Sequence, residues 1–207
     1  MIAAVLLAAG SARRFDGTQK LLARIRTRDG DVALVRHSVT GLFEAGLQEV
    51  IVVTGRDADL VRRELDGMAV RFAFNPDYAE GMSTSLRKGV TEAIRLWPRM
   101  NALLIALGDQ PLTGTGILAA LLSREPTIED HIGQPIVAPR YRGEMGNPVL
   151  FSRGVVSELL EVTGDRGARA VVENDPSRVR YVDLDREMPP DVDTLSDLDA
   201  LTTHRSK

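Results

Sequence analysis

The chain has 207 residues, 43% of them hydrophobic and 27% charged, which is the composition of an ordinary folded domain. Its net charge of −3 provides no basic field for nucleic acid or an anionic membrane, so neither is expected as a partner. Because the chain has no cysteine, disulfides, thiolate metal sites and a cysteine nucleophile are excluded.

The first half of the chain alternates apolar runs with amphipathic segments. This βαβ rhythm predicts an α/β fold with a mostly parallel sheet and helices on both faces. We expect strands at 2–7, 50–54, 70–74 and 102–107, and helices at 33–45, 57–65 and 83–96. Ligands bind such sheets at the carboxyl ends of the strands, so the loops that begin at Gly10, Gly55, Asn75 and Gly108 should share one edge.

The second half has a looser pattern and no linker long enough to separate a second domain. The chain is therefore predicted to be a single domain over residues 1–207. No basic segment precedes the first apolar run, so no signal peptide is predicted and a cytoplasmic location is expected. We expect helices at 114–123, 153–162, 166–173 and 196–201, and strands at 136–138, 149–151 and 178–182.

The loop after the first strand has the composition of a phosphate-binding turn. Leu7 is followed by Ala8, Ala9, Gly10 and Ser11, whose small side chains allow backbone N–H groups to approach an anion. Arg14 and Lys20 add positive charge nearby. A solvated turn is the simpler interpretation of this stretch taken alone, and it matches neither of the common glycine-rich nucleotide motifs.

Three aspartates are candidate metal ligands. Asp109 follows the apolar strand 102–107 and should emerge at the ligand edge of the sheet, where a carboxylate can hold Mg²⁺. Asp191 and Asp193 lie on the same side of an extended segment, and a cation between them would relieve their repulsion. A turn aspartate and an acidic helix cap are the alternative interpretations.

Three further stretches carry candidate binding residues. Asn75, Gly81 and Ser83 surround the predicted start of the helix at 83–96, where Ser83 would equally serve as a simple N-cap. Asn147 lies in a glycine-rich segment. Arg166 and Arg169 begin a predicted helix and could bind a phosphomonoester, although a capped surface helix explains them as well.

Five of these motifs, in this order, resemble those of the MobA-like nucleotidyltransferases. They are Leu-Ala-Ala-Gly-Ser with its downstream Arg and Lys at 7–20, Gly-Asp-Gln-Pro at 108–111, Gly-Asn-Pro at 146–148, Gly-Asp-Arg-Gly-Ala-Arg at 164–169 and Asp-Val-Asp-Thr at 191–194. The resemblance implies a Rossmann-like three-layer sandwich of the nucleotide-diphospho-sugar transferase type. It also implies a nucleotide-binding half at 1–112 and an acceptor-binding half at 113–207.

The resemblance is greatest to the molybdenum cofactor cytidylyltransferase branch. It implies Mg²⁺-dependent transfer of CMP from CTP to a phosphorylated small-molecule acceptor such as the molybdopterin cofactor, with a molybdoenzyme as a possible partner. Arg14, Lys20 and Asp109 would be catalytic, with Asp109, Asp193 and Asp191 on the metal. The remaining candidates, Leu7 to Ser11, Asn75, Gly81, Ser83, Asn147, Arg166 and Arg169, would contact the two substrates.

Two alternatives remain open. One is an NAD(P)H-dependent oxidoreductase, because a member of the MobA-like family reduces a dye. The other is a protein without catalytic activity that binds the molybdenum cofactor and delivers it to an enzyme.

Overall fold

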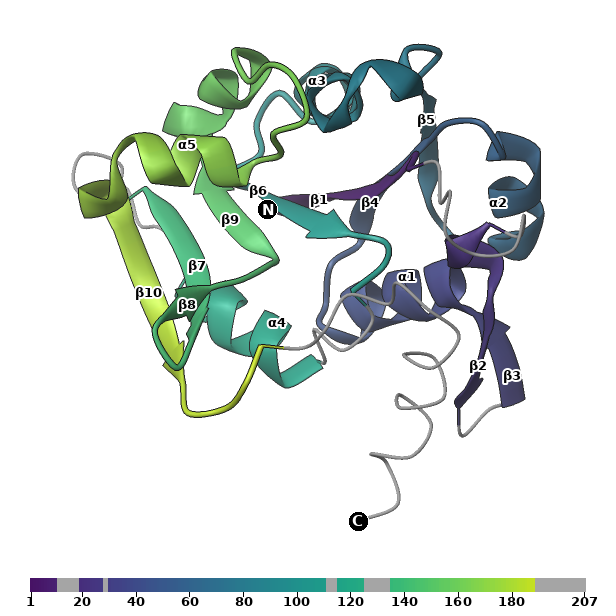
Figure 1. Cartoon of the computed structure of the whole chain (residues 1–207), viewed down its shortest axis with the longest axis horizontal. Coiled ribbons are helices and arrows are strands. Elements are labelled where there is room, and N and C mark those ends of the chain that lie inside the picture. Colours follow the sequence, from purple (N-terminus) through teal and green to yellow (C-terminus); the bar gives the residue numbers. More distant parts are fainter. Residues whose placement is uncertain (11–18, 28–29, 111–114, 125–134, 189–207) are drawn as a thin grey trace.

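The computed structural model describes residues 1–10, 19–27, 30–110, 115–124 and 135–188. In this part of the chain, eight strands form one sheet with helices on both faces, and a separate two-stranded hairpin lies at one end (Figure 1). The strands of the large sheet are β1 (Ile2–Ala8), β4 (Glu49–Thr54), β5 (Arg71–Phe74), β6 (Ala102–Leu107), β7 (Ile136–Tyr141), β8 (Glu144–Met145), β9 (Val149–Ser152) and β10 (Val179–Leu184). The predicted α/β class is confirmed.

The strand order is β10-β7-β9-β6-β1-β4-β5, with β8 paired to β7. β1 pairs in parallel with β4 on one side and with β6 on the other, and β4 pairs in parallel with β5. β9 runs antiparallel to both of its neighbours, β6 and β7. The direction of chain travel across the sheet therefore reverses at β1, which creates the crevice where α/β sheets bind ligands.

Alternate residues of the central strands enter two separate cores. One core is covered by α3 (Met82–Leu96), the 3₁₀ segment η4 (Arg153–Leu160) and α5 (Arg169–Asn174); the other is covered by α1 (Leu34–Glu44), α2 (Ala58–Glu64) and α4 (Thr115–Leu122). Figure 1 shows α3 and α5 above the sheet and α1 and α4 below it. Burial on both faces explains why these strands are continuous apolar runs rather than alternating ones.

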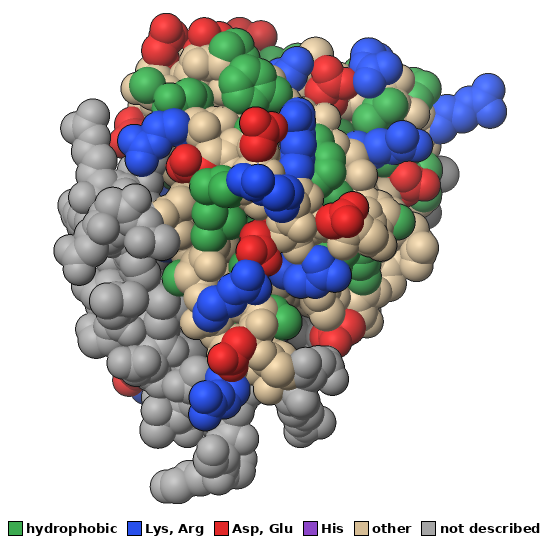
Figure 2. Space-filling model, turned by 90° about the vertical axis from the view of Figure 1, so that its right-hand side faces the viewer, with side chains coloured by type: hydrophobic (Ala, Val, Ile, Leu, Met, Phe, Trp, Pro, Cys, Tyr) green, Lys and Arg blue, Asp and Glu red, His purple; other side chains and the backbone are tan. Residues whose placement is uncertain are grey.

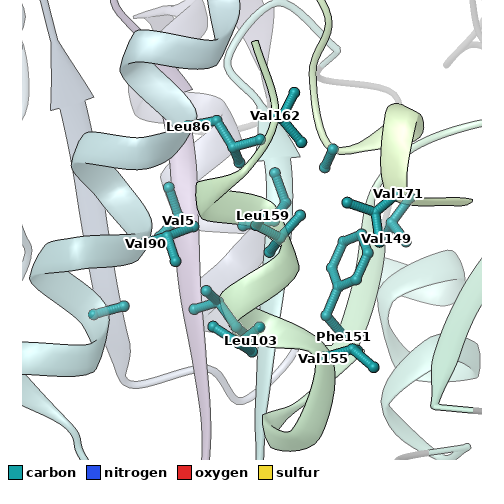
Figure 3. Close-up of a cluster of buried hydrophobic side chains, with 14 of the residues drawn as sticks. Val5, Leu86, Val90, Leu103, Val149, Phe151, Val155, Leu159, Val162 and Val171 are labelled. Carbon is teal, nitrogen blue, oxygen red and sulfur yellow. The ribbon is translucent and has the colours of Figure 1, made fainter.

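The first core is packed closely enough to require a glycine in the middle of α3. A Cβ atom at Gly89 would meet a methyl group of Val5 and lie 2.8 Å from Cγ2 of Val53. Figure 3 shows how Val5, Leu86 and Val90 meet where α3 lies on the sheet. The absence of a side chain thus sets the distance between helix and sheet.

We expect Gly89→Ala to destabilise the protein by about 1 kcal/mol or more, because the clash with two stiff valines outweighs the gain in helix propensity. The matched control is Gly41→Ala in α1, where a Cβ would have no neighbour within 4 Å. That substitution should instead stabilise by about 0.5–1 kcal/mol. Urea unfolding of both variants measures the difference, and a stabilised Gly89→Ala would contradict this packing argument.

The structure corrects several predicted elements. A hairpin of β2 (Arg24–Thr27) and β3 (Gly30–Ala33) precedes α1, and it was missed because two four-residue strands with few buried positions leave little periodicity. The segment predicted as a helix at 153–162 is the 3₁₀ segment η4, whose glycine and valines are poor α-helix formers. The helix predicted at 166–173 begins only at Arg169. The helix predicted at 196–201 lies outside the described residues.

Shorter 3₁₀ segments complete the described elements: η1 (Lys20–Leu22), η2 (Tyr78–Glu80) and η5 (Pro176–Arg178).

Figure 2 looks onto the side of the molecule that carries β5 and α2, where basic and acidic side chains are interspersed with apolar ones. Phe72 and Phe74 of β5 are partly exposed on this edge strand, and the Arg62 guanidinium lies 5.7 Å from the ring centre of Phe72. Within the part of the chain that the structure describes, no helix is long and apolar enough to span a membrane.

Candidate active site

The carboxyl ends of β1, β4, β5 and β6 meet at one edge, as the sequence predicted. The Gly108 amide donates to the Leu7 carbonyl oxygen at 3.0 Å, and the Asn75 amide donates to that of Thr54 at 2.8 Å. Gly55 lies so close to the first loop that a Cβ there would be 2.6 Å from the Ala9 carbonyl oxygen. The loops after all four strands are therefore neighbours.

Lys20 and Asp109, separated by 89 residues in sequence, form an ion pair at this edge. Lys20 Nζ lies 2.9 Å from Asp109 Oδ2, and their side chains are 11% and 33% exposed. Lys20 begins η1 at the end of the loop after β1, and Asp109 follows β6. The pair thus spans the point where the strand order reverses, with a buried cation beside a carboxylate that solvent or a ligand can reach.

Neighbouring groups hold this pair in place. Leu21, adjacent to Lys20, packs against Gly108, where a Cβ would be 3.1 Å from its Cδ2 atom. Ser38 of α1 has its hydroxyl 3.0 Å from the Gly108 carbonyl oxygen. These contacts fix the backbone on both sides of the ion pair, as a preorganised electrostatic site requires.

Asp109 is the candidate metal ligand that lies within the described residues. No hydrogen bond between described residues involves its Oδ1 atom, the side chain is 33% exposed, and a carboxylate oxygen is a ligand that Mg²⁺ accepts. The described residues contain no group of three or more potential metal ligands. Ser11, Arg14, Asp191 and Asp193 lie outside the described residues, so the predicted complete metal site stays a prediction.

Among the first-loop residues, Ala8 and Ala9 are buried and Gly10 is exposed. A Cβ at Gly10 would have no neighbour within 4 Å, so this residue borders open space. Leu7 is half-buried and packs against the core under α3. The described part of the loop after Leu7 therefore has only small side chains, which backbone contact with an anion would require.

Asn75 organises the loop that leads into α3. It is buried; its Nδ2 donates to Thr84 Oγ1 and to Ser85 Oγ, each at 2.9 Å, and its Oδ1 accepts the Asp77 amide at 3.0 Å. Ser83 is buried in the first turn of α3, and the N-cap is Gly81, two residues before it. The predicted N-cap at Ser83 is thus wrong, because the positive φ of Gly81 lets the helix begin earlier.

Two of the predicted acceptor residues, Arg166 and Arg169, share one carboxylate partner. Arg166 Nη2 and Arg169 Nε donate to the two carboxylate oxygens of Glu173 at 2.8 and 2.9 Å. The hydrogen bond from Arg166 holds the pKa of Glu173 below its ordinary value. Asn147 lies between β8 and β9 and is joined to Pro148 by a cis peptide bond. No hydrogen bond or ion pair between described residues joins Arg166, Arg169 or Asn147 to Lys20 or Asp109.

Sequence reasoning missed three residues at these loops. Gln19, beside Lys20, is 7% exposed, and its Oε1 atom has no partner among the described residues. Ser38 and Asp165 each bind a backbone group of a loop that is distant in sequence. Gln19 directly precedes the candidate Lys20 in the sequence, which was a signal, whereas Ser38 and Asp165 have no local pattern that marks them.

A cavity of about 270 Å³ lies between η4 and α5, lined among others by Glu158, Glu161 and Arg166. Glu158 accepts two hydrogen bonds from Arg178, at 2.8 and 2.7 Å, and these lower the pKa of its carboxyl below the ordinary 4.5. A lowered folded-state pKa adds stability above pH 4.5, which is lost as the pH falls through the folded value.

We therefore expect Glu158→Gln to lower the free energy of unfolding by about 0.5–1 kcal/mol at pH 7, since the pair is partly exposed, and by less at pH 3. Urea unfolding at both pH values measures this. Glu161→Gln, which removes a carboxylate from the same cavity but breaks no hydrogen bond to a described residue, should change neither value. An equal loss at both pH values for Glu158→Gln would rule out the charge effect.

Comparisons with known proteins agree with this architecture. The family model of the MobA-like NTP transferase domain matches residues 4–180, and the chain belongs to this family. Nicotine blue oxidoreductase of Paenarthrobacter nicotinovorans is 30% identical over 201 residues, covering 95% of this chain and 94% of that protein. The family model thus defines the class of this chain as that of the MobA-like NTP transferases.

Solved structures share the fold of this chain. Rv0371c of Mycobacterium tuberculosis H37Rv superposes with a TM-score of 0.80 at 30% identity over 97% of both chains, and a complex of that protein with manganese has a TM-score of 0.74 at the same identity and coverage. A nucleotidyl transferase from Methanothermobacter has a TM-score of 0.79 at 23% identity, covering 99% of this chain and 97% of that one. The last similarity supports the fold.

Proposed function

We propose that the chain is a divalent-cation-dependent nucleotidyltransferase that moves a nucleoside monophosphate, CMP from CTP in the first instance, onto a phosphorylated small-molecule acceptor. The observation that carries this proposal is the Lys20–Asp109 ion pair at the point where the strand order reverses. A cation and a carboxylate side by side suit a metal-bound triphosphate, because each can exchange its present partner for one of opposite charge on the substrate.

In the proposed reaction, an acceptor phosphate oxygen forms a bond to the α-phosphorus of the nucleotide. The bond from that phosphorus to the bridging oxygen breaks, and pyrophosphate leaves with the electron pair. Asp109, with Asp193 and Asp191, would hold Mg²⁺, which would neutralise charge on the phosphates. Lys20 and Arg14 would stabilise the departing pyrophosphate, and the amides of residues 9–11 would cradle it. No general base is needed, because an acceptor phosphate is already ionised near neutral pH.

The acceptor would bind to the half of the chain from residue 113 onward. The reaction would take place in the cytoplasm. Arg166 and Arg169, held side by side by Glu173, offer two guanidinium groups that suit a phosphomonoester. Asn147, Asn75, Gly81 and Ser83 would complete the contacts with the two substrates. A molybdopterin acceptor and a molybdoenzyme partner are the specific versions of this proposal, and they rest on the motif resemblance alone.

A second candidate function is NAD(P)H-dependent reduction. It is favoured by one observation, the 30% identity to nicotine blue oxidoreductase over nearly the full length of both proteins. Lys20 could bind a dinucleotide phosphate in that case, whereas Asp109 would have no evident role. In a protein that only carries the molybdenum cofactor, Asp109 would likewise not be needed to bind a metal on a nucleotide.

Isothermal titration calorimetry of CTP, GTP, ATP and NADPH, each with and without Mg²⁺, tests these candidates. With Mg²⁺, we expect CTP to bind more tightly than the other nucleotides, and without Mg²⁺ we expect CTP to bind only weakly. Assays of pyrophosphate release with candidate phosphorylated acceptors then identify the second substrate. If NADPH alone binds and Mg²⁺ has no effect, the reductase is the correct function. If no nucleotide binds, the carrier function gains support.

A further inference from the structure

The turn at Gly164 and Asp165 in the second half of the chain binds the start of α3 in the first half. Asp165 Oδ1 accepts the Met82 amide at 3.2 Å, and the Gly164 carbonyl oxygen accepts the Ser83 amide at 3.2 Å. The first two amides of α3 have no acceptor within the helix, so a carboxylate and a carbonyl group from the distant turn accept their hydrogen bonds. Met82 and Asp165 are 83 residues apart in sequence. Two loops from opposite halves of the chain are therefore joined directly.

The two loops approach each other closely at two glycines. Gly81 has φ +116°, and a Cβ there would lie 2.6 Å from the Gly164 carbonyl oxygen. A Cβ at Gly167 would lie 2.6 Å from Met82 Sδ. One turn further along α3, Arg87 Nη1 donates to the Val162 carbonyl oxygen at 3.0 Å. Backbone contact, side-chain packing and a third hydrogen bond all join the same two segments.

The contact continues into the loop after β5. The Thr84 hydroxyl lies 2.9 Å from the carbonyl oxygens of Gly81 and Asp77, and it accepts a hydrogen bond from Asn75 Nδ2. Asn75 in turn follows β5 at the ligand edge of the sheet. Asp165 is thus connected through the start of α3 to Asn75 and the loop that follows β5. Arg166 and Arg169 lie shortly after Asp165 in the sequence.

We propose that Asp165 is a positioning residue that makes the loop at 75–85 and the segment at 164–169 order and move together. A substrate that orders one loop then lowers the entropic cost of binding on the other, which makes the two binding events cooperative. The identity of the two substrates rests on the proposed function, whereas the coupling of the two loops does not depend on it.

Hydrogen exchange of the ligand-free protein tests the contact first. Asp165→Ala should speed exchange of the Met82 and Ser83 amides about fivefold to tenfold, as for the loss of a helix cap, and should also speed exchange in the loop at 75–80. Asp165→Asn retains an oxygen acceptor and should restore slow exchange at both places. If Asp165→Ala changes Met82 alone and leaves 75–80 unchanged, the coupling proposal is wrong.

The matched control is Asp175→Ala. Asp175 also accepts a backbone amide at a helix start, that of Ser177 at 3.1 Å, but within its own segment. Its removal should speed exchange only near Ser177. A change at 75–85 in this variant would show that any lost cap in the second half loosens the loop, and that Asp165 has no particular role.

Exchange with saturating Mg²⁺ and CTP then tests cooperativity. In the wild type the nucleotide should slow exchange at 75–85 and also at 164–172, and in Asp165→Ala the second effect should disappear. Persistence of that effect in Asp165→Ala would overturn the proposal. If CTP does not bind even the wild type, the proposed function fails, and the ligand-free comparison alone decides on Asp165.

Discussion

Replacing Asp109 with asparagine is expected to remove the Mg²⁺-dependent part of CTP binding and to lower kcat/KM for nucleotidyl transfer by about 10²–10³-fold, as for loss of one preorganised charged group. Asparagine keeps the shape of the side chain but loses the negative charge that attracts both Lys20 and a divalent cation. Calorimetry with and without Mg²⁺ and pyrophosphate release at varied CTP concentration measure the two effects.

Asp183→Asn is the control for this experiment. Asp183 also carries an ion-paired carboxylate, with Arg140 at 2.6 Å, but on β10 at the far edge of the sheet from β5. We expect it to leave nucleotide binding unchanged. If Asp109→Asn binds CTP with undiminished Mg²⁺ dependence, the metal is held elsewhere and our assignment of Asp109 is wrong.

Replacing Phe151 with alanine is expected to destabilise the protein by about 3–5 kcal/mol. Phe151 is fully buried on β9, where it is paired with Leu103 of β6 and Ile136 of β7. Figure 3 shows its ring within the cluster that includes Val149, Val155 and Val171. The surrounding strands and helices cannot collapse fully into the space that the ring would leave. Urea unfolding monitored by circular dichroism measures the loss.

Phe74→Ala provides the comparison for burial. Phe74 is also a strand residue, but it lies on the edge strand β5 with 46% of its surface exposed. We expect its loss to cost less than about 1 kcal/mol, because little apolar surface returns to water. Equal effects for the two phenylalanines would contradict the position of the core.

Elements with strong local patterns could be predicted from the sequence. The strand at Ala102–Leu107 has the predicted bounds, because a six-residue apolar run after a proline-terminated helix permits few other structures. The helix at Met82–Leu96 differs from its prediction by one residue. The shared edge of Gly10, Gly55, Asn75 and Gly108 was also predictable, since parallel strands place their carboxyl ends together. The sequence by itself thus determined the α/β class and the edge that carries the candidate site.

Only the tertiary structure decided which distant groups meet. The antiparallel direction of β9, the Lys20–Asp109 pair and the contact of Asp165 with α3 all join residues without a common periodicity. A local pattern reports which face of an element is buried, because burial repeats with the turn of the helix or the pleat of the strand. It carries no information on a partner 83 or 89 residues away, whose position depends on how the whole sheet is assembled.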